Sequence, residues 1–123
     1  MGYEVRLFAV ERLTDFDDGG PAFASVVAEI DLCKIGDGKM SDLHTASTPL
    51  KPRAYVYGLD GDTQFKLDRY DKPLSVMEVD DVIKAIEHDN KTEKYRRFTM
   101  ALAMLKVFRK EFGKEAKVLG YGH

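Results

Sequence analysis

Residues 98–108 read FTMALAMLKVF, and this stretch decides how the rest of the chain must fold. Apolar side chains recur here and in the flanks at steps of three and four residues, which predicts an amphipathic helix. One face carries Tyr95, Phe98, Leu102, Leu105, Phe108 and Phe112. A second apolar stripe on roughly the opposite side carries Met100, Ala103, Met104 and Val107. Such a helix must be covered on two sides, either within the fold or by a partner.

Length and composition place the chain among ordinary soluble globular proteins. Its 123 residues suit a single domain, 1–123, with 44% apolar and 33% charged residues. No apolar run approaches the roughly 20 residues that cross a bilayer, and no secretory signal is recognisable at the start. The single cysteine, Cys33, excludes an internal disulfide. We therefore expect a cytoplasmic protein without a membrane partner.

The net charge of −2 conceals an uneven distribution along the chain. Residues 1–90 carry 10 Lys and Arg against 18 Asp and Glu, whereas residues 91–123 carry 9 against 3. This asymmetry indicates either a basic binding face or two parts of the fold that attract each other.

A basic cluster stands at the start of the long helix, which Thr92 is predicted to cap and Gly113 to end. The cluster consists of Lys91, Lys94, Arg96 and Arg97. Cations are unfavourable at a helix N-terminus, because its free amides carry partial positive charge. Two interpretations follow. Either Glu87 and Asp89 of the preceding helix neutralise the cluster, or the cluster and the helix amides bind an anion such as phosphate.

The first half of the chain shows the two-residue period of strands. Residues 3–10 and 23–34 should pair as an antiparallel hairpin, and Val26, Ala28, Ile30 and Leu32 are predicted to share one face. Two further short strands, 53–59 and 63–70, flank a turn at Asp60 and Gly61. Residues 36–52 lack any period and contain Gly, Ser, Thr and Pro, which predicts a long accessible loop.

The remaining elements complete an α+β fold. Residues 74–79 form a linker or edge strand, and a short helix follows from the N-cap Asp80 to about Asp89, with Asn90 as its stop. Residues 116–121 form a last strand. The predicted architecture is an antiparallel sheet of four to five strands packed on one long C-terminal helix with a short helix beside it, in the order ββββααβ.

No motif in the sequence carries a recognised chemistry. Asp15, Asp17 and Asp18 lack the spacing of a calcium loop. The three histidines, His44, His88 and His123, form no metal-binding pattern, and the glycines form neither a P-loop nor a dinucleotide fingerprint. We therefore predict no catalytic residue, no metal site and no cofactor.

The predicted function is a small non-enzymatic regulatory or protein-interaction module that forms a homo-oligomer. Its interface would be Met100, Met104 and Val107, because burial of each such side chain is worth about 1.5–3 kcal/mol. A first alternative is a binder of an anionic ligand, nucleotide or nucleic acid, through Lys91, Lys94, Arg96 and Arg97. A second alternative is a small hydrolase that uses Asp and His residues from the loops.

Overall fold

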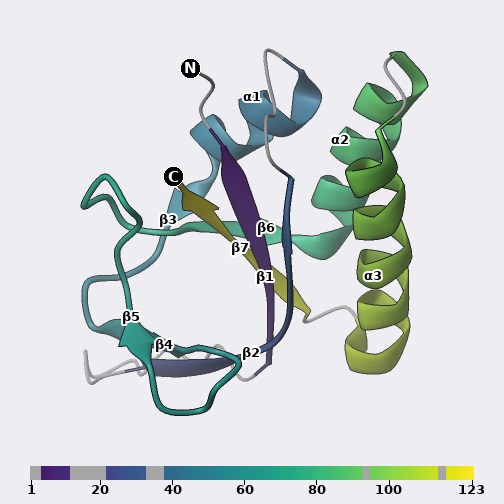
Figure 1. Ribbon diagram of the computed structural model, residues 1–123. Coiled ribbons are helices and arrows are strands. Elements are labelled where there is room, and N and C mark those ends of the chain that lie inside the picture. Colours follow the sequence, from purple (N-terminus) through teal and green to yellow (C-terminus); the bar gives the residue numbers. More distant parts are fainter. Residues whose placement is uncertain (1–3, 12–21, 33–37, 93–94, 114–115) are drawn as a thin grey trace.

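The computed structural model describes residues 4–11, 22–32, 38–92, 95–113 and 116–123 (Figure 1). In chain order the elements are β1 Val5–Glu11, β2 Ala22–Asp31, α1 Lys39–Ala46, β3 Thr48–Pro49, β4 Ala54–Tyr57, β5 Gln64–Phe65, β6 Ser75–Glu78, α2 Val79–Thr92, α3 Arg96–Phe112 and β7 Lys117–Gly122. The predicted α+β class is confirmed. The predicted order ββββααβ is not matched, because it lacks α1 and β3 and does not count residues 74–79, the predicted linker or edge strand, in which β6 lies.

The strands form one mixed sheet with the order β3-β6-β7-β1-β2-β4-β5. The central strand β1 pairs antiparallel with both β2 and β7. β2 and β4 are parallel, while the other neighbouring strands run antiparallel. The sheet is therefore larger than the predicted four to five strands, and it is not purely antiparallel.

A β-bulge in β2 divides that strand between the two faces of the sheet. Ala9 faces Ala28 and Val10 faces Val26, which leaves Val27 without an opposite residue on β1. A bulge bends its strand and reverses the alternation beyond it. Ala28 accordingly packs on the helix side of the sheet, and Val26 packs on the other side. The prediction that these two residues share a face is wrong for this reason.

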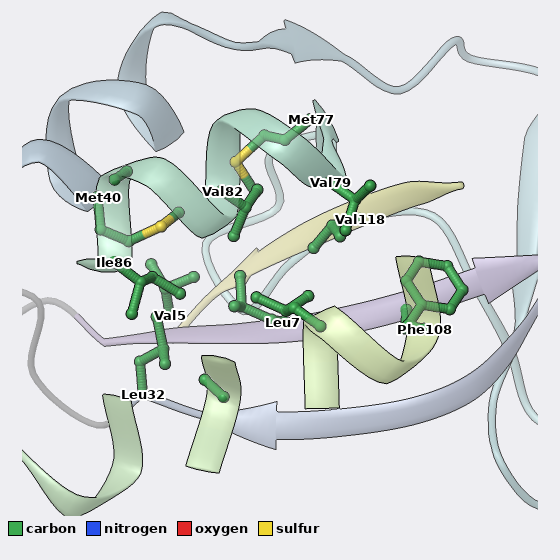
Figure 2. Packing of buried hydrophobic residues seen from close by; sticks show 14 of the residues in the cluster. Val5, Leu7, Leu32, Met40, Met77, Val79, Val82, Ile86, Phe108 and Val118 are labelled. Atoms are coloured by element: carbon green, nitrogen blue, oxygen red, sulfur yellow. The ribbon is translucent and has the colours of Figure 1, made fainter. Parts of the chain in front are cut away.

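The helix–sheet core lies between one face of the sheet and the helices α2 and α3, which run side by side (Figure 1). Figure 2 shows Val82 and Ile86 of α2 directed toward Val5 and Leu7 of β1. Only part of the predicted apolar face of α3 is buried in this core. Its buried residues are Phe98, Ala101, Leu105 and Phe108.

A second core, the strand-side core, fills the opposite face of the sheet. Phe65 of β5 packs on Phe8 of β1, with ring centroids 5.2 Å apart, although β2 and β4 separate these two strands in the sheet. The sheet must therefore curl. The strand-side core consists of Phe8, Val10, Ala22, Ala24, Val26, Leu50, Ala54, Val56, Leu74 and Leu119. Both faces of the sheet are thus covered by the chain itself.

Helix α1 occupies the middle of the segment predicted to be a loop, so that prediction is wrong. Its first residue follows Gly38, which supplies no side chain to cap the free amides. The carboxylate of Asp89, in α2, accepts hydrogen bonds from the backbone N–H of Lys39 at 2.8 Å and of Met40 at 2.9 Å. The cap is therefore a residue about fifty positions away in the sequence, and no residue next to α1 predicts it.

The boundary between α2 and α3 also differs from the prediction. Asn90 lies inside α2, and its side-chain oxygen accepts a hydrogen bond from the backbone N–H of Tyr95 at 3.0 Å. Tyr95 precedes the first turn of α3, so Thr92 is the last residue of α2 rather than the cap of α3. An ion pair between Asp80 and Arg109, 2.9 Å, ties the two helices together at the other end.

The predicted hairpin at Asp60 and Gly61 is confirmed by the antiparallel pairing of β4 and β5. The Asp60 carboxylate accepts hydrogen bonds from the Thr63 hydroxyl and from the backbone N–H of Thr63 and of Asp62, and these bonds lower the pKa of Asp60. Gly61 adopts a φ of 78°, which favours glycine. Within the described part of the chain, none of the helices is long and apolar enough to cross a membrane.

Candidate functional site

A cleft of about 1080 Å³ opens where the sheet is incomplete, at the end of β7. Strand β6 pairs with β7 only as far as Ser75, opposite Gly120. Beyond that point the backbone N–H of Arg69 donates to the carbonyl of Gly122, so a loop replaces a neighbouring strand. The lining residues are Glu4, His44, Thr45, Asp68, Arg69, Tyr70, Lys72, Pro73, Ser75 and His123.

His44 projects from α1 into this region and is 7% exposed. Its ring packs against Gly120, where an added Cβ would lie 2.6 Å from the ring Nδ1. A glycine is therefore required at this position to leave room for the imidazole. Burial lowers the pKa of His44, because a charged ring would lose its hydration, and the negative charge of Asp68 opposes part of this shift.

Asp68, 8% exposed, is the other buried polar side chain among the described residues. One oxygen of its carboxylate accepts hydrogen bonds from the backbone N–H of Tyr70 at 2.8 Å and of Lys72 at 3.1 Å. Its own backbone N–H donates to the carbonyl of Lys72 at 2.7 Å. The Asp68 side chain therefore fixes the conformation of the loop that forms one wall of the cleft.

His123, Glu4 and Asp31 converge at the edge of the cleft. The Nδ1 of His123 lies 3.3 Å from a Glu4 carboxylate oxygen, and its Nε2 lies 3.2 Å from a carboxylate oxygen of Asp31. Arg6 approaches the same Asp31 oxygen at 3.9 Å. Two backbone hydrogen bonds, 3.1 and 2.9 Å, pair Glu4 with His123. These groups could hold a cation, because they offer one imidazole nitrogen and two carboxylates.

The cleft also contains the residue types of a hydrolytic triad, in Ser75, His44 and Asp68. The Ser75 hydroxyl, however, donates to the backbone carbonyl of His44 at 3.2 Å, and the Ser47 hydroxyl donates to the same carbonyl at 2.8 Å. A triad requires the serine hydroxyl to donate to the imidazole. The observed arrangement stabilises the end of α1 and is not that of an activated nucleophile.

The structure describes three of the four residues of the predicted basic cluster, and anion binding by this cluster stays a prediction. Lys91, Arg96 and Arg97 are exposed, and Lys94 lies outside the described residues. The Arg97 guanidinium donates to the backbone carbonyl of Asp31 at 2.9 Å.

The acidic residues that were expected to neutralise the cluster have other contacts. Asp89 caps α1, and a Glu87 oxygen lies 4.0 Å from the Lys106 ammonium.

The second apolar stripe of α3 lies largely on the surface. Met100 is 65% exposed and Val107 is 61% exposed, the highest values among the large apolar residues described. Ala103, between them, is also exposed. Met104 is only half-buried and packs against the helix–sheet core, so it belongs partly to the interior. We call Met100, Ala103 and Val107 the α3 seam.

Comparison of the chain with protein-family models, with curated proteins and with solved structures gives no match. The cleft and the α3 seam are therefore the two features from which a function can be inferred.

Sequence reasoning missed the cleft because its polar residues come from four separate segments. Glu4 precedes β1, His44 lies in α1, Asp68 follows β5 and His123 follows β7. No spacing links them. One usable signal was present: His44 follows Met40 by four residues, so a helix there would direct both side chains to the same side.

Proposed function

We propose that this protein is a non-enzymatic interaction module that self-associates through the α3 seam. The observation that carries the proposal is the high exposure of Met100 and Val107 on one helix face, at 65% and 61%. The remaining large apolar side chains of α3 are more deeply buried or lie at its ends. Burial of an exposed Met or Val is favourable by about 1.5–3 kcal/mol, which gives a second copy a reason to bind there.

The spacing of the seam suits a helix–helix contact. Its residues follow at steps of three and then four, 100, 103 and 107, which is the spacing that keeps a narrow stripe facing a partner helix. The small Ala103 in the middle lets two helix axes approach closely. Met104 supports the seam from the side of the helix–sheet core.

A two-fold antiparallel arrangement makes the seam complementary to itself. If the axis passes between Ala103 and Met104, Met100 of each copy meets Val107 of the other. The same axis brings Arg96 of one copy toward Glu111 of the other, which pairs opposite charges at both ends. The positive charge of Arg97 is not directed at the partner helix, because its guanidinium donates to the Asp31 carbonyl of its own copy.

The dimer should be weak. Two copies bury two Met and two Val side chains that are now about two-thirds exposed, which yields about 4–8 kcal/mol in total. Association itself costs at least about 4 kcal/mol in lost translational and rotational freedom. The net gain is at most about 4 kcal/mol, so a dissociation constant on the order of 1 mM is expected, and the measurement must reach millimolar protein concentrations.

Sedimentation equilibrium from about 0.05 to 3 mM tests the proposal, because this range spans the expected dissociation constant. The wild type should shift from monomer to dimer, and Val107→Glu should remain monomeric because it buries a charge in the seam. Leu59→Glu is the matched control, since Leu59 is also an exposed apolar residue, at 57%, but lies in the β4–β5 turn. It should dimerise like the wild type.

A charge exchange tests the antiparallel geometry separately. Arg96→Glu should weaken the dimer, and Arg96→Glu combined with Glu111→Arg should restore it. A wild type that stays monomeric at the highest concentration, or equal effects of the Val107 and Leu59 variants, would show that the α3 seam is not an interface.

A further inference from the structure

We propose that Glu4, Asp31 and His123 form a binding site for one divalent first-row transition cation of the Zn²⁺ type, open on the side of the cleft. This inference concerns a different surface from the α3 seam and does not depend on self-association. It rests on the donor atoms, on how the sheet holds them and on the hydrogen bonding of the His123 ring.

The donor atoms are nearly close enough to share one ion. One oxygen of each carboxylate and one ring nitrogen all lie within 4.8 Å of one another. Zn²⁺ binds such atoms at about 2.0–2.2 Å in a tetrahedral arrangement, so two ligands of one ion lie roughly 3.4 Å apart. Side-chain rotations that close a remaining gap of up to about 1.4 Å would complete the site.

The sheet fixes the three residues before any ion arrives. Glu4 and His123 are paired by two backbone hydrogen bonds, and the backbone N–H of Leu32 donates to the carbonyl of Val5 at 2.9 Å, directly beside Asp31. The three ligands thus come from the ends of adjacent strands β7, β1 and β2. Because these strand ends are already held in place, little binding free energy is spent on ordering the ligands.

The hydrogen bonding of His123 gives an independent reason for a cation. The side chain of His123 is largely buried and faces a carboxylate at each nitrogen. Its Nε2 is buried and makes no hydrogen bond of good geometry within the described residues, despite the 3.2 Å approach of Asp31. A shared divalent cation would give this buried nitrogen a partner, because the ring nitrogen and both carboxylates then act as ligands.

The donor set defines the class of ion. Imidazole nitrogen suits Zn²⁺ and its neighbours in the first transition row, whereas Mg²⁺ and Ca²⁺ prefer all-oxygen sites. Three protein ligands leave at least one position for water or a further ligand, and the adjoining cleft supplies the space for it. The buried residues His44 and Asp68 line the same cleft.

Titration of metal-free, untagged protein tests the proposal. Isothermal titration with Zn²⁺ should give one site per chain, Co²⁺ should produce visible d–d absorption on binding, and Mg²⁺ at the same concentration should give neither signal. His123→Gln and, separately, Asp31→Asn should each lower the Zn²⁺ affinity at least about tenfold. Circular dichroism would establish that each variant is folded.

His88→Gln is the matched control. His88 also lies 3.3 Å from a carboxylate, that of Asp89, but it is exposed and belongs to no three-ligand cluster among the described residues. Its Zn²⁺ affinity should equal that of the wild type. The proposal is overturned if the wild type shows no saturable binding at about 100 µM Zn²⁺, or if His123→Gln binds as tightly as His88→Gln. The three residues would then form an ion-pair network only.

Discussion

Replacing Asp89 by Asn should destabilise the whole domain, although Asp89 belongs to no apolar core. Its carboxylate, with a side chain only 10% exposed, is the acceptor for the first two amides of α1. Gly38 makes room for it, because a Cβ there would lie 2.5 Å from one of the carboxylate oxygens. Asparagine keeps one oxygen but loses the charge, and its amide group would face a backbone N–H donor.

The magnitude follows from the two hydrogen bonds. A hydrogen bond to a charged group contributes about 1.5–3 kcal/mol, and loss of a helix cap costs about 0.5–2 kcal/mol. The amide of Lys39 is exposed and can bind water instead, so most of the loss arises at Met40. We expect the free energy of unfolding to fall by about 2 kcal/mol, which corresponds to a melting temperature lower by roughly 6–10 °C.

Urea denaturation of Asp89→Asn measures this loss, with Asp81→Asn as the matched control. Asp81 lies on the same helix but is exposed in its first turn, so its replacement should cost less than about 1 kcal/mol. Hydrogen exchange in residues 39–46 should rise in the Asp89 variant alone. If the two variants unfold within about 0.5 kcal/mol of each other, the carboxylate is not the cap that orders α1.

Two further changes test the packing of His44. Gly120→Ala should lower the unfolding free energy by about 1–3 kcal/mol, because the new Cβ would lie 2.6 Å from the ring; Gly58→Ala, with its nearest contact at 3.6 Å, is the control. Burial lowers the pKa of His44, so its contribution to stability should be complete above its ordinary value of 6.5 and decline as the pH falls below it. Urea titrations between about pH 5 and 7.5 should show this slope, and His44→Gln should reduce it; an unchanged slope would contradict a neutral buried ring.

The local periods of the sequence correctly predicted the elements that depend on near neighbours. The strand pair β1 and β2, the β4–β5 hairpin, the last strand and the long helix all follow from alternation, helical spacing or turn chemistry within a few residues. The assignment of Met100 and Val107 to a second apolar stripe also came from spacing alone. Whether that stripe is an interface stays a prediction.

The elements that the sequence did not reveal are those stabilised from a distance. Helix α1 buries only two of its residues, Met40 and His44, and has no side-chain cap from its own N-cap residue. Its first two backbone amides donate instead to Asp89. The even-numbered apolar residues of β2 suggest one continuous face, but the bulge at Val27 places them on two. The parallel pairing of β2 with β4 joins strands that are separated by α1 and β3.

The sequence by itself determined the class of the fold, because amphipathic periods oblige each element to bury one face. The tertiary structure decided which residues meet at the cleft. Glu4, Asp31 and His123 are brought together by the register of three strands, and His44 contacts Gly120 from α1, whose first turn is capped by Asp89 of α2. Such contacts depend on bulges, strand register and caps from distant parts of the fold. These features produce no periodic pattern of residues in the sequence.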